Sequence, residues 1–73
     1  MNEYTVLLIW DNEAQVWYCT SDDIPGLILE SNSLDTLVER ARHAAPELLE
    51  LMGLDPVNAS LSFKAERHAT VFA

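Results

Sequence analysis

The seven residues YTVLLIW, at positions 4–10, decide the fold that we predict for this chain. They are aromatic, β-branched or apolar, which is the composition typical of a β-strand. Residues 6–10 are five consecutive hydrophobic residues, and such a run indicates a strand that is covered on both faces. We therefore expect this strand to lie inside a sheet rather than at its edge, and the other elements are placed relative to it.

Three more strands are predicted around this central one. The polar segment DNEAQ, 11–15, is short enough for a hairpin connection to a second strand, VWYCT, 16–20. After the break SDDIPG, 21–26, the segment LILES, 27–31, is predicted as the third strand. In SLSFKAER, 60–67, apolar and polar residues alternate, which indicates a half-buried strand at the edge of the sheet.

A helix is predicted between the third and fourth strands. Ser33 is a suitable N-cap, Asp35 in the first turn suits the helix dipole, and Gly53 is a natural stop. Pro46 cannot donate a hydrogen bond to the carbonyl of Arg42, so we expect a kink, or a break at which Pro46 opens a second short helix. Apolar residues recur at helical spacing along one face: Leu34, Leu37, Val38, Ala41, Ala45, Leu48 and Met52.

The order β-β-β-α-β predicts one α+β domain over residues 1–73. Short connections make the first three strands an antiparallel meander, and the fourth strand returns after a right-handed helical crossover. Because the first strand lies inside the sheet, the fourth must pair beside it and run parallel to it. The predicted sheet order is therefore 3-2-1-4.

One helix covers only one face of such a sheet, and the other face also carries apolar side chains. Leu7 and Ile9 point to one face of the sheet, and the residues next to them in the strand point to the opposite face. An exposed apolar patch of this kind usually marks an interface. A domain of 73 residues is marginally stable alone, and Cys19 has no second cysteine to pair with. We therefore predict a homodimer or an obligate protein partner.

The net charge of −8 lies in the first half of the chain, where no Lys or Arg precedes Arg40. An acidic field repels phosphate backbones and attracts basic proteins, so it disfavours direct binding of nucleic acid. The same charge also serves solubility, which is an equal alternative to an acidic partner surface.

The sequence favours a cytoplasmic protein with no membrane association. The chain has no apolar run of the ~20 residues that a membrane span needs, and its N-terminus lacks the pattern of a signal peptide. A single cysteine fits a reducing compartment.

Adjacent aspartates at 22 and 23 raise the question of a metal or acid–base site. Neighbouring residues of a strand point to opposite faces, so Asp22 and Asp23 would not converge on one ion. In a turn, by contrast, aspartates accept hydrogen bonds from nearby backbone N–H groups. Because Pro25-Gly26 suits the central positions of a type II turn, we predict a turn, with a partner contact as the alternative.

No catalytic, cofactor or metal site is predicted elsewhere, so we expect a protein that is not an enzyme. The two histidines and Cys19 lack the spacing of a zinc site or of a nucleophile–base pair, and two glycines cannot form a phosphate loop. Cys19 is predicted to be a small buried hydrophobic residue. The acids nearest to a metal-dependent nuclease set lie outside the first strand: Asp11, Glu13 and Glu30.

Two segments, VWYCTSDDIPGL at 16–27 and SNSLDTLVERARHAAPELLELMG at 31–53, resemble the HicB-like antitoxin family, most closely its small single-domain members of unassigned function. Residues 23–26 match the family's Pro-Gly turn, residues 33–37 match its helix entry, and Leu27 stands where a cysteine is often found. The resemblance implies a partial ribonuclease-H-like fold without an active site. It also implies a protein that binds and masks a small basic toxin ribonuclease.

We therefore predict a non-enzymatic, antitoxin-like protein-binding domain. The alternative is an orphan homodimeric module, structural or regulatory, that has no toxin and dimerises through its exposed sheet face. The residues predicted to contact a partner are aromatic anchors and acids: Trp10, Trp17, Asp22, Asp23 and Glu30.

Overall fold

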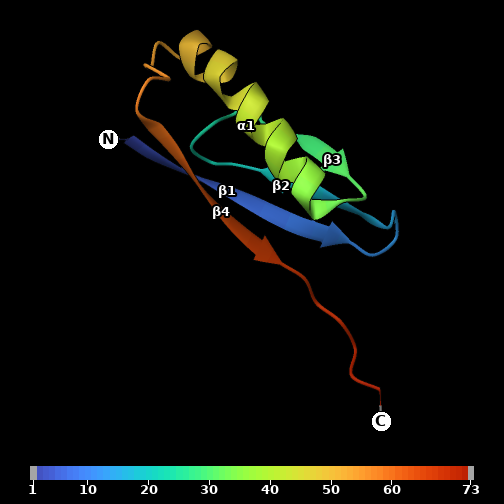
Figure 1. Cartoon of the computed structure of the whole chain (residues 1–73). Coiled ribbons are helices and arrows are strands. Elements are labelled where there is room, and N and C mark those ends of the chain that lie inside the picture. The colour runs from blue at the N-terminus through green and yellow to red at the C-terminus, as the bar shows by residue number, and fades with distance from the viewer. Residues whose placement is uncertain (1, 73) are drawn as a thin grey trace.

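The computed structural model describes residues 2–72 and confirms the predicted α+β architecture (Figure 1). The elements are β1 (Asn2–Asp11), β2 (Val16–Thr20), β3 (Leu29–Ser31), α1 (Leu34–Leu51) and β4 (Ala59–Glu66). They form one sheet of order β3-β2-β1-β4, in which β2 is antiparallel to β1 and β3, and β4 is parallel to β1. The central position of β1, on which the predicted order depends, is therefore confirmed.

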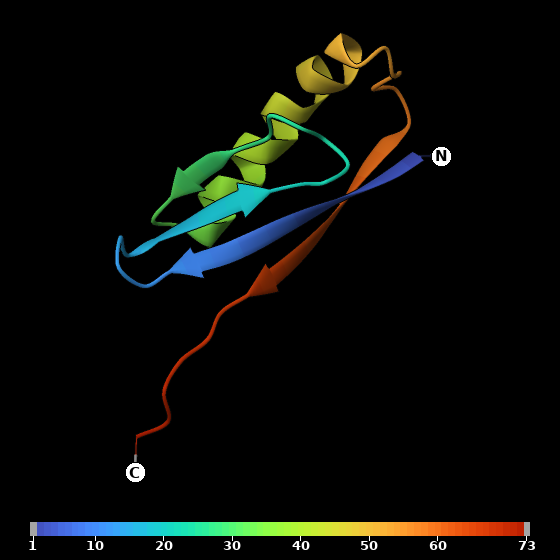
Figure 2. The same ribbon diagram turned by 180° about the vertical axis from the view of Figure 1, so that it is seen from behind.

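The hydrophobic core lies between the sheet and α1, which covers one face of the sheet over β2 and β3 (Figures 1 and 2). Along β1, Val6 and Leu8 point to α1 and are buried, whereas Leu7 points to the other face and is 38% exposed. Met52, which was predicted on the apolar helix face, is the C-cap residue and is 43% exposed, and Leu49 is the last buried residue of the helix. The core consists of Val6, Leu8, Cys19, Ile24, Leu27, Leu37, Ala41, Ala45 and Leu49.

Helix α1 begins and ends at the predicted signals. The Ser33 hydroxyl accepts a hydrogen bond from the Thr36 N–H at 3.3 Å, and Gly53 has a φ of +78° directly after the cap. The predicted break at Pro46 is wrong, because the helix is continuous from Leu34 to Leu51. Both Pro46 and Arg42 are exposed, so water can satisfy the Arg42 carbonyl that lacks its intrahelical partner.

The connection from β2 to β3 has the predicted turn, but β3 begins two residues later than predicted. The Leu27 N–H donates to the Ile24 carbonyl at 3.2 Å, and Gly26 has a φ of +94°, as a type II turn requires. The Ile28 N–H then donates to the Gly26 carbonyl at 2.9 Å, which forms a second, tighter turn around Leu27. These turns remove residues 27 and 28 from the strand, direct Leu27 into the core and leave Ile28 73% exposed.

The chain after β4 leaves the body of the domain. Residues 67–72 extend away from the sheet and form no further strand (Figure 1). The radius of gyration is 13.6 Å, whereas a compact domain of 73 residues has one of about 11 Å. No helix within residues 2–72 has both the length and the apolar character needed to cross a membrane.

Candidate functional site: an acidic open sheet face

The sheet face opposite α1, which we call the open face, has an apolar centre formed by Leu7, Ile9 and Tyr18. Ile9 and Tyr18 are directly paired across β1 and β2, and Leu7 precedes Ile9 by two residues, so the three side chains share this face. None of the three packs against the core cluster. Because α1 lies on the other side of the sheet, no element within residues 2–72 covers them (Figures 1 and 2).

Carboxylates lie at both ends of this apolar centre. Asp22 and Asp23 line a shallow depression together with Leu7. At the other end, Asp11 and Glu30 line a second depression together with Tyr18. An apolar, aromatic centre with a charged margin is the usual composition of a protein–protein interface. We call these four acids the acidic margin.

The charge of the open face is not wholly negative. Lys64 of β4 is paired with Leu7 and shares its face, and Glu66 follows Lys64 by two residues on the same side. Arg40 of α1 reaches the edge of β3, where its Nη1 donates to the Glu30 carbonyl at 2.6 Å and lines the depression around Tyr18. The acids of the margin still outnumber these two cations, so the face suits a basic partner.

Asp23 and Ser21 have a structural role at the end of the β1–β2 pairing. The last paired residues there are Leu7 and Thr20, so Thr5 has no β2 residue opposite it. Instead, the Thr5 N–H donates to the Asp23 carboxylate at 2.8 Å, and the Ser21 hydroxyl donates to the Thr5 carbonyl at 2.5 Å. Two side chains thus provide the hydrogen bonds that a further residue pair of the ladder would provide.

The two adjacent aspartates therefore differ in their surroundings. The backbone N–H of Asp23 donates to the Ser21 hydroxyl at 3.2 Å, and the N–H of Ile24 does so at 3.2 Å, which fixes the start of the turn. Asp22 is exposed next to Leu7. Both aspartates lie in a turn, as predicted, and Asp22 is the one better placed to contact a partner.

The predicted aromatic anchors lie on the other side of the sheet. Trp10 and Trp17 are paired across β1 and β2, on the face that carries α1, with ring centroids 5.5 Å apart in an edge-to-face arrangement. The Arg67 guanidinium lies 4.1 Å above the Trp10 ring, a cation–π contact. The structure thus brings Asp22, Asp23 and Glu30 to one face and separates them from both tryptophans.

Tyr18 is the aromatic residue of the open face, and it was not among the predicted contacts. The signal for it was present in the sequence, since Trp17 and Tyr18 are neighbours on a strand and must point to opposite faces. Which of the two faces α1 covers decides which of them is available to a partner.

The remaining candidates for chemistry are dispersed. Within residues 2–72, no three side chains of His, Cys, Asp or Glu are grouped so that they could hold a metal ion. The Asp11 carboxylate accepts hydrogen bonds from the backbone N–H groups of Glu13 and Ala14 at 3.0 and 3.2 Å, which stabilises the hairpin turn. His43 is exposed on α1, and His68 contacts Glu66 at 2.9 Å beyond the sheet.

Cys19 is fully buried in the core, as predicted, with its Sγ 3.8 Å from the Leu27 carbonyl. Burial raises the pKa of its thiol above the usual value, because the charged thiolate would lose its solvation there. A buried thiol with a raised pKa is a poor nucleophile, so Cys19 acts as a small hydrophobic residue of the core.

Comparison with known proteins identifies a family and a related structure. Residues 3–73 match the family described as "Domain of unknown function (DUF1902)". The chain is similar to hypothetical protein TTHA1013 from the extremely thermophilic bacterium Thermus thermophilus, with 32% sequence identity and a TM-score of 0.73. The similarity covers 99% of this chain and 100% of that one. No curated protein matches the chain. Neither name states an activity or a binding partner.

Proposed function

We propose that this chain, which belongs to the DUF1902 family, is a non-enzymatic protein-binding domain of the antitoxin type that acts in the cytoplasm. The observation that supports this proposal is the open face, where the apolar side chains of Leu7, Ile9 and Tyr18 lie uncovered between the carboxylates of the acidic margin. Such a face offers both a surface to bury and a charge to recognise.

The charge selects the class of partner. The apolar centre and the acidic margin of the open face come from the part of the chain that precedes Arg40, which contains no Lys or Arg. Carboxylates that frame an apolar centre attract a basic protein, accelerate its association and repel nucleic acid. The apolar centre, with Tyr18 as its aromatic residue, then provides most of the binding energy.

The resemblance of residues 16–27 and 31–53 to HicB-like antitoxins supports a narrower form of the proposal. On this basis the basic partner is a small toxin ribonuclease, which the open face would mask. In this proposal the domain contributes no catalytic group, and the acids nearest to a metal-dependent nuclease set lie in the hairpin or at the strand edge: Asp11, Glu13 and Glu30.

The acidic margin also bears on the alternative of an orphan homodimer joined through the open face. Two copies facing each other across that surface would place their carboxylates in opposition, and like charges brought together at an interface cost free energy. The open face is therefore better suited to a basic partner than to a second copy of this acidic chain.

A pair of charge reversals tests the proposal against a defined partner, the small basic protein expected from the adjacent reading frame. We expect Glu30→Lys to raise the Kd of the complex about tenfold or more, because it places a cation in the acidic margin. Glu50→Lys is the matched control: it makes the same change of charge at an exposed position of α1, outside the open face. Isothermal titration calorimetry at low and at raised salt provides the measurement.

The outcomes of this titration separate the candidates. Tight binding that weakens with salt, and that weakens further with Glu30→Lys but not with Glu50→Lys, supports the basic-partner proposal. Equal effects of the two reversals would place binding outside the open face. If the adjacent basic protein does not bind at all, the orphan module becomes the better description.

A further inference from the structure

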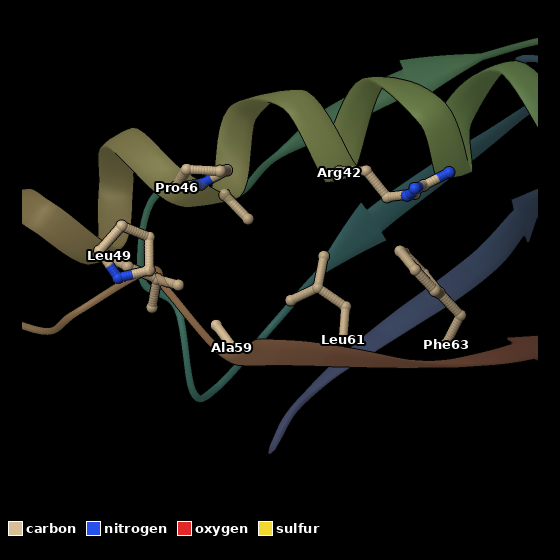
Figure 3. A pocket seen from close by; sticks show the side chains of 8 residues that line it. Arg42, Pro46, Leu49, Ala59, Leu61 and Phe63 are labelled. Atoms are coloured by element: carbon tan, nitrogen blue, oxygen red, sulfur yellow. The ribbon is translucent and has the colours of Figure 1, made fainter. Parts of the chain in front are cut away.

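Strand β4 presents an unpaired edge with an apolar groove beside it. β4 pairs only with β1, so along its outer side the alternate N–H and C=O groups of eight residues face no other strand of the part of the chain that the structure describes. Because α1 lies over β2 and β3, it leaves a groove of about 190 Å³ between itself and β4 (Figure 3). Pro46 and Leu49 line the groove from the helix, opposite Leu61 and Phe63 from the strand.

Exposed apolar side chains are concentrated in the two segments that flank β4. The segment that leads into β4 carries Leu51, Met52, Leu54 and Val57, of which Val57 is 68% exposed. The tail that follows β4 carries Val71 and Phe72, which are 89% and 98% exposed. Within one copy these segments lie at opposite ends of β4 (Figure 1), so they cannot cover each other.

We propose that β4 pairs antiparallel with β4 of a second copy of this chain, on a two-fold axis at Ser62. In an antiparallel pair, the segment that follows one strand runs beside the segment that precedes the other. The tail of one copy therefore reaches residues 51–57 of the second copy. The exposed apolar residues at the two ends of β4 are then complementary to each other across the dimer.

The same arrangement closes the groove. With the axis at Ser62, Leu61 is opposite Phe63 of the second copy, and residues paired across strands point to the same face. Both α1 helices then lie on one side of a sheet of eight strands, and the two grooves meet above the seam. The seam buries the apolar side chains that α1 leaves partly uncovered in a single copy.

The charges of this edge also favour a second copy there. Residues 59–72 carry Lys64 and Arg67 against the single acid Glu66, whereas the net charge of the whole chain is −8. Repulsion between two acidic copies is therefore weakest along β4. In the proposed register Lys64 is opposite Ser60 of the second copy rather than another lysine. The open face remains uncovered in such a dimer, so its proposed function does not depend on this pairing.

Sedimentation of the full chain tests the proposal. We expect a mass of twice 8.2 kDa, and we expect Phe72→Asp and Val57→Asp each to raise the dimer Kd about tenfold or more. Ile28→Asp is the matched control, because it also replaces an exposed apolar residue with an acid but lies away from β4. All three positions are exposed, so circular dichroism should show an unchanged fold.

Two results would overturn the proposal. One is that the wild-type chain sediments as a monomer at high concentration. Every second backbone amide of β4 would then exchange its hydrogen freely, as in an unpaired edge strand. The other is a dimer that Ile28→Asp weakens and Phe72→Asp does not, which would place the interface at the depression around Tyr18 on the open face, because Ile28 also lines that depression. Protection of consecutive amides along residues 59–66 in the dimer, with the expected order of variants, would support the edge pairing.

Discussion

Replacing Leu27 with alanine is expected to lower the free energy of unfolding by about 2–5 kcal/mol, the range measured when a buried leucine is truncated. Leu27 is 1% exposed and belongs to the core, although it lies in a turn rather than in a strand. A domain of 73 residues has a total stability of only about 4–11 kcal/mol, so the loss takes a large part of it. Urea unfolding followed by tryptophan fluorescence measures the change.

The neighbouring residue provides the control for this prediction. Ile28 is 73% exposed, and Ile28→Ala should change the free energy of unfolding by no more than about 0.5 kcal/mol. Comparable losses for the two variants would contradict the turn geometry that directs Leu27 inward. A larger loss for Ile28→Ala would mean that the segment is in the opposite orientation.

Replacing Ser21 with alanine is expected to cost about 1–3 kcal/mol, because the backbone groups that its hydroxyl contacts lose their partner in a buried place. The hydroxyl donates to the Thr5 carbonyl and accepts from the N–H groups of Asp23 and Ile24, and Ser21 is only 8% exposed. The loss should appear in urea unfolding and as faster hydrogen exchange of the Ile24 amide.

Asp22→Ala tests whether this cost is specific to the buried network. Asp22 is the next residue in the chain and is exposed, so its truncation should leave the stability within about 0.5 kcal/mol of the wild type. If Ser21→Ala lowers the free energy of unfolding no more than Asp22→Ala does, the Ser21 hydroxyl does not stabilise the connection between β2 and β3.

The sheet order could be predicted because a single segment determines it. The hydrophobic run at residues 6–10 placed β1 inside the sheet, and the short connections on its C-terminal side fixed the meander, so β4 had one position left. The ends of the helix could also be predicted, because the signals at Ser33 and Gly53 act within one turn of their own positions.

Other features depend on contacts that no local pattern contains. The residues 27–31 fit a strand, and only the double turn around Gly26 removes Leu27 from it. The Asp23 carboxylate accepts from Thr5, which is 18 residues away in the chain. The predicted break at Pro46 failed because water can replace one missing hydrogen bond at an exposed helix position, and the buried face of α1 holds the helix together.

The candidate site was predicted in part for the same reason. Strand alternation separates Trp17 from Tyr18, but it does not show which face the helix covers, and side-chain size alone favours the tryptophans as anchors. The acids Asp22 and Glu30 did reach the open face, because turns and strand ends lie at its margin.

The two proposed surfaces give the chain separate sites for separate partners. Pairing through β4 would use the edge and the apolar segments beside it, whereas a basic protein would bind the open face. Dimerisation would also stabilise a small domain by mass action, because it links folding to association. The two surfaces can be tested independently, since Phe72 and Glu30 belong to different ones.

The most direct test of the proposed function is a map of amide chemical shifts in ¹⁵N-labelled chain during titration with the adjacent basic protein. We expect the largest shifts at Leu7, Ile9 and Tyr18 and in the acidic margin, with little change along the exposed side of α1. Shifts confined to α1, or to Trp10 and Trp17 on the helix side of the sheet, would contradict the open face as the binding site.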